Sequence, residues 1–435
     1  ENTELEKHKP MTYVVFFILC LLNFFLGIIS VLKFKYNNLA LKLFFVITIL
    51  APLGKLTTKF HTNWQISSYY LFFVGCFLVF VLKLLSNNKF KKQTIATLVI
   101  TVGTLLILGI HYFLIGDKDV TLTNILKDIK PYLTILLAIP FLEVYKSRLG
   151  QILTRKFINN ILLINLLITT VFFFLMLQFD LHLKLTDDPY FEFEEVRLET
   201  LGIFFGGFYL FYLVIKDKKP TLKEIVISGV PLFYTGNRTM IFAFILVMFV
   251  VYVSKLTFKK ILLLISGGIL SFLSLGYLVV TATENSPIYR IKKLFEDGYI
   301  SESFATRFSP FINAISDFSF LNFIVGKGVG LTFYIKWFVW RSEIDNYNVY
   351  LDSLYLTLYA KYGVFSILFF VIFYLYLNSY RNIKASNYYY LLFVLIAITN
   401  SFCYQFNFLW FLIIIAAPYN VANNSMAIQS QNKTP

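Results

Sequence analysis

Apolar runs that approach the length of a bilayer crossing recur along most of the chain, and they constrain its fold more than any other feature. A membrane-spanning helix needs about 20 predominantly apolar residues, and fewer where neighbouring helices bury it. Thirteen runs are candidates, near residues 12–32, 39–54, 66–85, 94–115, 131–145, 158–180, 200–215, 222–235, 239–254, 261–281, 363–379, 387–400 and 403–418. The sequence therefore predicts an all-α polytopic membrane protein with about 12–13 transmembrane helices.

The composition agrees with a chain whose solvent is the lipid bilayer. Of its 435 residues, 58% are hydrophobic and only 14% are charged, whereas soluble proteins are about 25% charged. The net charge of +15 arises from short clusters between the apolar runs, so it favours cytoplasmic loops over a nucleic-acid partner. Cys20, Cys76 and Cys403 lie inside apolar runs without metal-ligand or redox spacing, which argues against a disulfide or zinc framework.

The apolar runs divide the chain into four regions. Residues 1–280 hold the first ten predicted transmembrane helices, and residues 281–362 form a large extracytoplasmic loop. Residues 363–418 hold the C-terminal helices, and residues 419–435 predict a disordered polar tail. The first run begins at Met11 without a small-residue cleavage site, which favours a retained span over a signal peptide.

Lysine and arginine gather in every second loop and so predict the orientation of the helices. Basic loops are retained in the cytoplasm. The clusters are Lys33/Lys35/Lys42, Lys83/Lys89/Lys91/Lys92, Lys146/Arg148/Arg155/Lys156, Lys216/Lys218/Lys219/Lys223, Lys255/Lys259/Lys260 and Arg381/Lys384. The loop 180–199 carries seven acidic residues against Lys184 and Arg197, so it is predicted to lie outside. By the same alternation, the turn 235–238 and the segment 281–352 share that outer face.

The segment 281–352 is more than a simple linker. Its apolar residues between 289 and 323 are spaced for short amphipathic helices that lie at the membrane interface. The glycine-rich turn Gly326-Lys327-Gly328-Val329-Gly330 follows, but it lacks the residues of a nucleotide P-loop. Asp352-Ser353-Leu354-Tyr355-Leu356 then leads to Gly363, where the next predicted span begins.

Four features in this order resemble the O-antigen polymerase and O-antigen ligase superfamily over roughly residues 190–418. The first two are an outer arginine followed by glycine at the head of a span, Arg197 to Gly202, and the turn Thr235-Gly236-Asn237-Arg238-Thr239. The third is the large outer loop with Arg290, Arg307 and the glycine turn 326–330. The last is the stretch Asp352 to Leu356 with Gly363, in which aspartate stands where the ligases carry histidine. This substitution favours the polymerase branch.

The resemblance implies a polyprenol-dependent glycosyltransferase of the GT-C type in a bacterial inner membrane, with its active site on the extracytoplasmic face. A polymerase would transfer the growing glycan from undecaprenyl diphosphate onto a lipid-linked repeat unit, with inversion and without a metal or other cofactor. Its partners would be the undecaprenyl-diphosphate-linked oligosaccharide, the lipid bilayer and a chain-length regulator protein, and not nucleic acid.

The chemistry of that reaction assigns roles to individual residues. Departure of the diphosphate builds negative charge, and arginine meets it well because its planar fork donates two hydrogen bonds to phosphate oxygens. The acceptor hydroxyl needs a general base, for which Asp352 is the first choice and Asp345 or Glu343 the alternatives. The candidate catalytic residues are therefore Asp352 and Arg307. The candidate contacts to diphosphate and glycan are Arg197, Arg238, Arg290, Asp345 and Tyr355.

Each of these residues also has a purely structural explanation. Arg197 and Arg238 lie beside span ends, where arginines anchor helices to lipid headgroups. Arg290 fits the solvated face of an amphipathic helix. Asp352 fits a helix N-cap, a position at which aspartate is favoured.

Three other functions would involve a similar lipid-linked substrate or similar residues. An O-antigen ligase would share the donor and the arginines. A flippase or other transporter of lipid-linked oligosaccharides would place charges within its spans and show related halves, which are not evident in the sequence. A peptidoglycan polymerase would share the lipid chemistry, but the acidic outer-loop motif expected of that family is not evident here.

Overall fold

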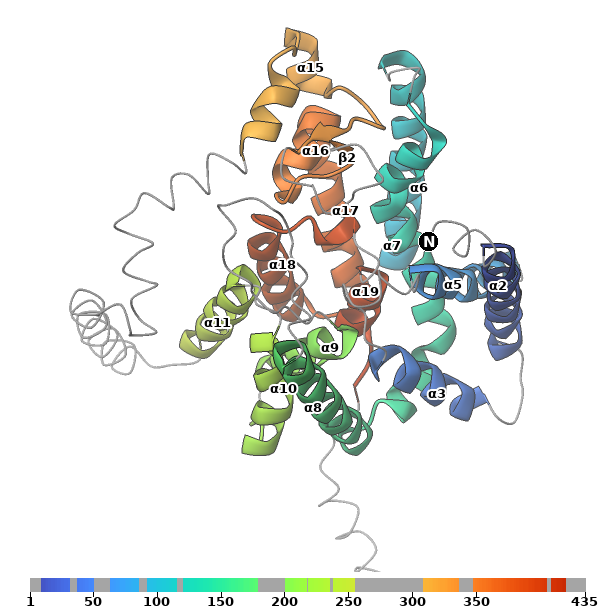
Figure 1. Ribbon diagram of the computed structural model, residues 1–435, viewed down its shortest axis with the longest axis vertical. Coiled ribbons are helices and arrows are strands. Elements are labelled where there is room, and N and C mark those ends of the chain that lie inside the picture. The colour runs from blue at the N-terminus through green and yellow to red at the C-terminus, as the bar shows by residue number, and fades with distance from the viewer. Residues whose placement is uncertain are drawn as a thin grey trace, which may run out of the picture.

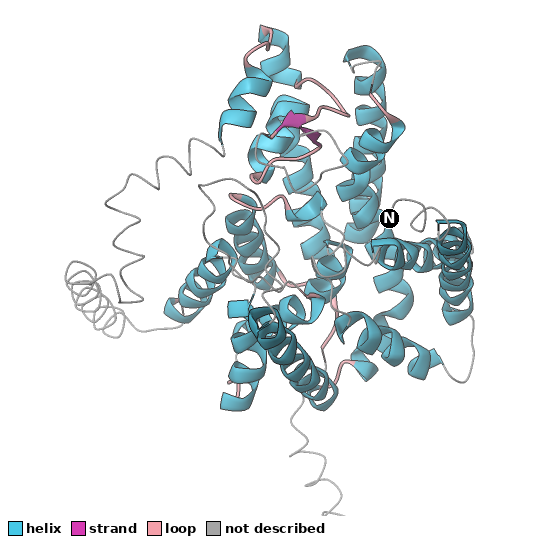
Figure 2. Ribbon diagram, in the orientation of Figure 1, coloured by secondary structure: helices cyan, strands magenta, loops and turns pink. Residues whose placement is uncertain are grey.

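A computed structural model shows a largely helical protein (Figure 1). It describes residues 9–31, 37–50, 63–85, 92–115, 120–178, 200–216, 218–234, 238–254, 308–335, 347–404 and 408–419. The predicted span 261–281, the loop 180–199, residues 235–237 of the predicted outer turn, all of residues 281–307 and the tail from 420 lie outside this part of the chain. Figure 2 shows that helix dominates the described residues, with one short pair of strands.

Apolar runs form helices wherever the prediction falls on described residues. In the first half of the chain these are α2 (Lys9–Val31), α3 (Asn37–Leu50), α5 (Asn63–Leu85), α6 (Lys92–Ile115), α7 (Leu122–Ile152) and α8 (Arg155–Gln178). In the second half they are α9 (Leu201–Ile215), α10 (Leu222–Tyr234), α11 (Arg238–Val253), α15 (Phe320–Val325), α16 (Leu354–Tyr362), η2 (Gly363–Ser366), α17 (Ile367–Tyr380), α18 (Ile383–Ala397), η3 (Phe402–Tyr404) and α19 (Phe408–Ala416).

Three helical segments among the described residues are long and apolar enough to cross a membrane: Lys92–Leu114, Arg155–Leu175 and Leu354–Tyr380. The last one comprises α16, η2 and α17, but the chain turns at Gly363, whose φ is 55°, and the Tyr355 and Phe370 rings lie 5.0 Å apart, so α16 folds back along α17. Shorter apolar helices accompany them at Cys20–Ile29, Leu71–Leu82, Leu201–Ile215, Met240–Val253 and Ile383–Ala397. The all-α membrane-protein class predicted from the sequence therefore agrees with the described helices.

Polar contacts join helix ends that the charge pattern assigns to the same side. Asp128 of α7 contacts Lys361 of α16 at the end predicted to be extracytoplasmic, which we call the outer end. Arg155 of α8 contacts Glu224 of α10 at the opposite, inner end. Thr97 of α6 and Ser379 of α17 also meet near the inner end, with 3.2 Å between their hydroxyl oxygens. The alternation of basic loops and the packing of the helices thus give one consistent arrangement.

One helix begins earlier than its apolar run predicts. The run 131–145 lies within α7, which begins at Leu122, whereas the run 363–379 begins at Gly363 as η2 and α17, after the separate helix α16. The added turns of α7 carry Asp128, which meets Lys361 of α16, and both side chains are 0% exposed. Charged residues normally mark the end of a membrane span. Here they lie inside helices, where the two charges neutralise each other.

A small folded unit lies against the outer end of the bundle, at the top of Figure 1. We call it the cap, residues 308–335 and 347–353. Its strands β1 (Phe333–Tyr334) and β2 (Tyr347–Asn348) pair antiparallel, with Phe333 opposite Asn348. Its core is separate from that of the bundle and consists of Phe333, Ile335, Leu351 and Ala360 with partly buried neighbours. Because Ala360 belongs to α16, the cap shares its core with the outer end of a candidate span.

Candidate functional site

Most residues that the sequence analysis proposed for the site lie outside the described residues. This applies to Arg197, Arg290, Arg307 and Asp345. Arg238 begins α11, and its side chain is also outside what the structure describes. Asp352 and Tyr355 are described, and they lie at the junction of the cap and α16.

Asp352 presents an exposed side chain where the cap meets the first turn of α16. The helix begins at Leu354 with Ser353 as its N-cap, so Asp352 precedes the capping position. Its backbone is held from two sides. The Ser401 hydroxyl lies 3.4 Å from the Asp352 carbonyl oxygen and donates to it, and the neighbouring Leu351 N–H donates to Thr357 Oγ1 at 2.9 Å. An exposed carboxylate on a fixed backbone can accept a proton from a bound hydroxyl.

Tyr355 joins two helices of the bundle. Its hydroxyl donates to the carbonyl oxygen of Val394 on α18 at 3.0 Å. Its ring stacks on Phe370 of α17, with centroids 5.0 Å apart and planes at 10°. The hydroxyl is therefore engaged within the protein, and the partly buried ring is the part that a glycan could contact.

The glycine turn closes the end of α16. The backbone N–H of Lys327 donates to Ala360 O at 3.0 Å, and that of Gly328 donates to Lys361 O at 2.9 Å, so two terminal carbonyls of the helix find partners. Gly326 has a φ of 79°, and a Cβ there would overlap the Lys361 carbonyl. Glycine is required because the two backbones touch. The turn is thus a helix cap and a packing contact.

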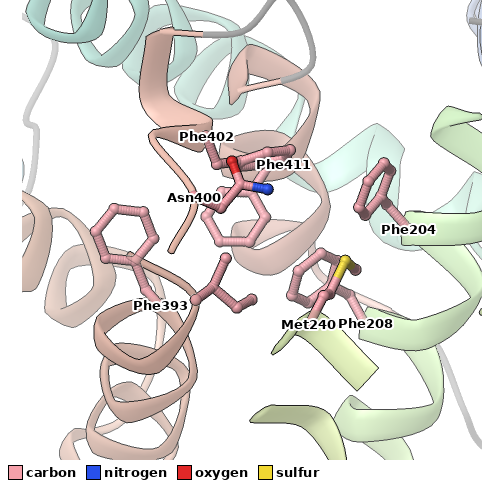
Figure 3. A pocket seen from close by; sticks show the side chains of 8 residues that line it. Phe204, Phe208, Met240, Phe393, Asn400, Phe402 and Phe411 are labelled. Atoms are coloured by element: carbon pink, nitrogen blue, oxygen red, sulfur yellow. The ribbon is translucent and has the colours of Figure 1, made fainter. Parts of the chain in front are cut away.

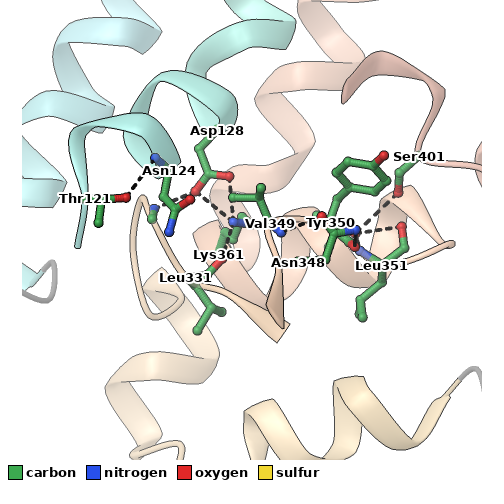
Figure 4. A network of polar contacts seen from close by, with 12 residues as sticks. Thr121, Asn124, Asp128, Leu331, Asn348, Val349, Tyr350, Leu351, Lys361 and Ser401 are labelled. Atoms are coloured by element: carbon green, nitrogen blue, oxygen red, sulfur yellow. Dashed lines mark hydrogen bonds and ion pairs between the residues drawn. The ribbon is translucent and has the colours of Figure 1, made fainter. Parts of the chain in front are cut away.

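A buried ion pair joins this turn to α7 (Figure 4). The Lys361 ammonium donates to both carboxylate oxygens of Asp128 at 2.6 and 2.7 Å and to the Leu331 carbonyl at 2.5 Å. The Gly330 N–H donates to Asp128 Oδ2 at 2.5 Å. Two charges removed from water are tolerated when each is paired and hydrogen-bonded. The pair therefore fixes the cap, α7 and α16 to one another.

The ion pair is the central feature that the sequence analysis missed. A signal was present: Asp128 and Lys361 each stand beside an apolar run, and an ionisable residue at such a position normally has a partner or a function. The two residues are 233 positions apart, however, and many other charged residues flank the predicted spans. Only the packing of α7 against the cap identifies the partners.

Below the outer ends of α9, α11 and α18 lies a small apolar hollow of about 10 Å³, shown in Figure 3. Phenylalanine rings and Met240 dominate its lining, and Asn400 is its polar member. The residues that line it are Phe204, Phe208, Met240, Phe393, Ile396, Asn400, Phe402 and Phe411. This space holds about one water molecule, so the hollow as it stands does not accommodate a sugar. In the described part of the chain, no three His, Cys, Asp or Glu residues gather as metal ligands.

Helices of membrane-spanning length, joined at both ends by buried polar contacts and covered at one end by a folded cap, define an all-α protein of the membrane-spanning type. The family model that matches residues 184–431, more than half of the chain, is that of a family of unknown function, DUF6369, and the chain belongs to this family. No curated protein and no solved structure matches the chain.

Proposed function

We propose that the protein is a surface-polysaccharide polymerase with a GT-C type fold in a bacterial inner membrane. It would transfer the growing glycan from undecaprenyl diphosphate onto a lipid-linked repeat unit at the extracytoplasmic face. The observation that carries the proposal is the position of Asp352, an exposed carboxylate on a fixed backbone where the cap meets α16. A polyprenol-linked substrate would present its sugar at this level because its lipid remains in the bilayer.

In the proposed reaction, the acceptor hydroxyl attacks the anomeric carbon of the donor and gives its proton to Asp352. The new carbon–oxygen bond forms as the bond to the diphosphate breaks, and undecaprenyl diphosphate leaves with the electron pair. Arg307 would meet the developing charge, with Arg197, Arg238 and Arg290 as further phosphate contacts. Asp345 and the ring of Tyr355 would contact the glycan. Attack from the face opposite the leaving group inverts the anomeric centre.

The test is a polymerisation assay on the purified protein in detergent with a lipid-linked repeat unit, with products resolved by size. Asp352→Asn removes the base while keeping the shape, and we expect a loss of about a hundredfold or more. Arg307→Ala removes one transition-state contact and should cost about a hundredfold. Asp317→Asn is the matched control, since Asp317 is an exposed acid of the same cap and should leave the ladder unchanged.

The outcomes separate the rival functions. A ladder that survives Asp352→Asn excludes this residue as the base. Transfer to a separate lipid acceptor without a ladder identifies a ligase. The absence of glycosyl transfer with every acceptor, in a protein that elutes as a single folded species, would remove the enzyme proposal.

A second candidate is a flippase for lipid-linked oligosaccharides. The observation that favours it is Lys361, a buried cation within a candidate span. Transporters often use such residues. Against this role, the Lys361 ammonium already contacts both oxygens of Asp128 and the Leu331 carbonyl. Movement of labelled lipid-linked sugar across proteoliposomes, lost in Asp128→Asn, would support transport.

A further inference from the structure

The helix α15 presents an apolar surface that the described residues leave exposed. Its sequence, Phe-Leu-Asn-Phe-Ile-Val, contains no charged residue, and none of its side chains is buried. Phe320 is 83% exposed, and Leu321, Phe323 and Ile324 are between 41% and 56% exposed. Exposed apolar side chains that adjoin one another in this way mark a surface that binds a partner or a membrane.

Two contacts fix the level of α15 relative to the candidate spans. His111, near the end of α6, has its Nε2 2.8 Å from the Val325 carbonyl oxygen. Gly363, where α16 passes into η2, lies against the Ile324 carbonyl so closely that a Cβ would overlap it. The C-terminal end of α15 is therefore level with His111 on one candidate span and with Gly363 on the other.

The rise per residue of a helix gives the distance of these positions from the inner ends of the spans. The Thr97–Ser379 contact places these two residues of α6 and α17 at one level, and Lys92, the first residue of α6, lies about 8 Å inward of it. Measured along the helix axes from the level of Lys92, His111 lies about 29 Å outward and Gly363 about 33 Å. The hydrocarbon core of a bilayer is about 30 Å thick. With the inner hydrocarbon boundary at the level of Lys92, α15 lies at the outer one.

The surface next to α15 is also apolar and exposed. Phe113 and Leu114, at the end of α6, are 85% and 78% exposed, and Val364 and Phe365 of η2 are 61% and 46% exposed. These residues belong to candidate spans, whose exposed apolar side chains would face lipid in a bilayer. The apolar side of α15 continues this surface at its outer edge.

We propose that α15 is an interfacial helix that inserts its apolar side into the outer leaflet of the bilayer, where the hydrocarbon meets the headgroups. The partner is lipid, and the helix anchors the cap at a fixed height. A short apolar helix at the interface gains free energy from each buried side chain without crossing the membrane. This inference rests on the position of α15 and stands whether or not the protein is a polymerase.

Spin labels at single cysteines in a nanodisc-embedded protein test the proposal. The three native cysteines are first replaced by alanine. Labels are then placed at Phe320→Cys, at Leu106→Cys as a mid-span reference on α6, and at Ser316→Cys as an exposed polar reference in the cap. Collision with oxygen, which concentrates in lipid, is compared with collision with a water-soluble nickel complex. We expect the oxygen-to-nickel ratio at residue 320 to exceed that at residue 316 several-fold and to approach that at residue 106.

Either of two results would overturn the proposal. A ratio at residue 320 equal to that at residue 316 places α15 in water. Shielding from both reagents shows that protein covers the surface, as a second copy of the chain would. Each labelled variant must elute from gel filtration as the parent does, and Leu321→Cys replaces Phe320→Cys if that variant fails to fold.

Discussion

The two ends of the helix bundle each contain an ion pair, but the pairs are built differently. At the inner end, Arg155 donates from Nε and Nη2 to the two oxygens of Glu224, both at 2.6 Å, and the arginine side chain is 22% exposed. Glu224 also accepts from the Thr221 N–H at 2.8 Å, while Thr221 Oγ1 accepts from the Glu224 N–H at 3.3 Å. This reciprocal pattern is a capping box at the start of α10.

At the outer end, Asp128 and Lys361 are both 0% exposed, and their remaining hydrogen bonds go to the backbone of the glycine turn. The inner pair is therefore built on a local helix-capping motif, whereas the outer pair depends on segments that are distant in the sequence. The comparison shows that a buried charge can either cap the start of one helix, as Glu224 does, or hold several elements together, as Asp128 and Lys361 do. The following predictions test this contrast, from the largest expected effect to the smallest.

Lys361→Met should destabilise the protein most. It leaves Asp128 buried without its cation, which typically costs about 3–5 kcal/mol, and it leaves the Leu331 carbonyl without a donor. The measurement is the free energy of unfolding in detergent, followed by denaturant. The double variant Asp128→Asn with Lys361→Gln restores neutral hydrogen-bonding partners and should be more stable than Lys361→Met alone. Stability of Lys361→Met equal to the parent's would show that the outer pair does not hold the cap.

Gly326→Ala should have the next largest effect. The residue has positive φ, and its Cβ would meet the backbone of Lys361, which cannot move without shifting α16. Strain of this kind costs about 1–3 kcal/mol. Gly109→Ala is the matched control, because Gly109 is helical in α6 with no atom within 4 Å of an added Cβ, and alanine should stabilise the helix by up to about 1 kcal/mol. Equal effects of the two variants in thermal unfolding would contradict the close contact.

Arg155→Lys should have the smallest effect of the three. Lysine keeps the charge but loses the planar fork that reaches both oxygens of Glu224. Because the site is partly open to solvent and the capping box remains, we expect a cost of about 1 kcal/mol. Lys156→Gln, one residue further along on an exposed position, is the control and should be neutral in the same unfolding assay. A cost as large as that of Lys361→Met would remove the contrast between the two ends.

The sequence predicted helices best where an apolar run is bounded by cations. The runs 94–115 and 158–180 correspond to α6 (Lys92–Ile115) and α8 (Arg155–Gln178), with ends that differ by only a few residues. Their boundaries were clear because charged or polar residues follow the apolar stretch directly. Helix α7 begins earlier than predicted because Asp128 marks a membrane boundary in the sequence while being a buried partner of Lys361 in the structure.

The sequence predicted which residues could carry out the chemistry of the candidate site, but it did not predict which residues lie next to them. Asp352 came from its place in a motif, and the structure adds that its backbone is held by Ser401, which lies 49 residues further along. The glycine turn was part of the predicted outer-loop pattern, but its neighbour, the end of α16, was not identified. No local pattern reports contacts between residues so far apart.

Sequence alone determined that the chain is helical and suited to a membrane, because hydropathy and charge clusters act on each segment independently of the others. Tertiary structure alone decided which charges are neutralised, which glycines touch a neighbouring backbone, and that α15 lies level with the ends of two candidate spans. These properties depend on distances between segments that are far apart in the chain. These contacts affect the stability of the protein most where they are buried, because a charge or a backbone group has no water there to replace a lost partner.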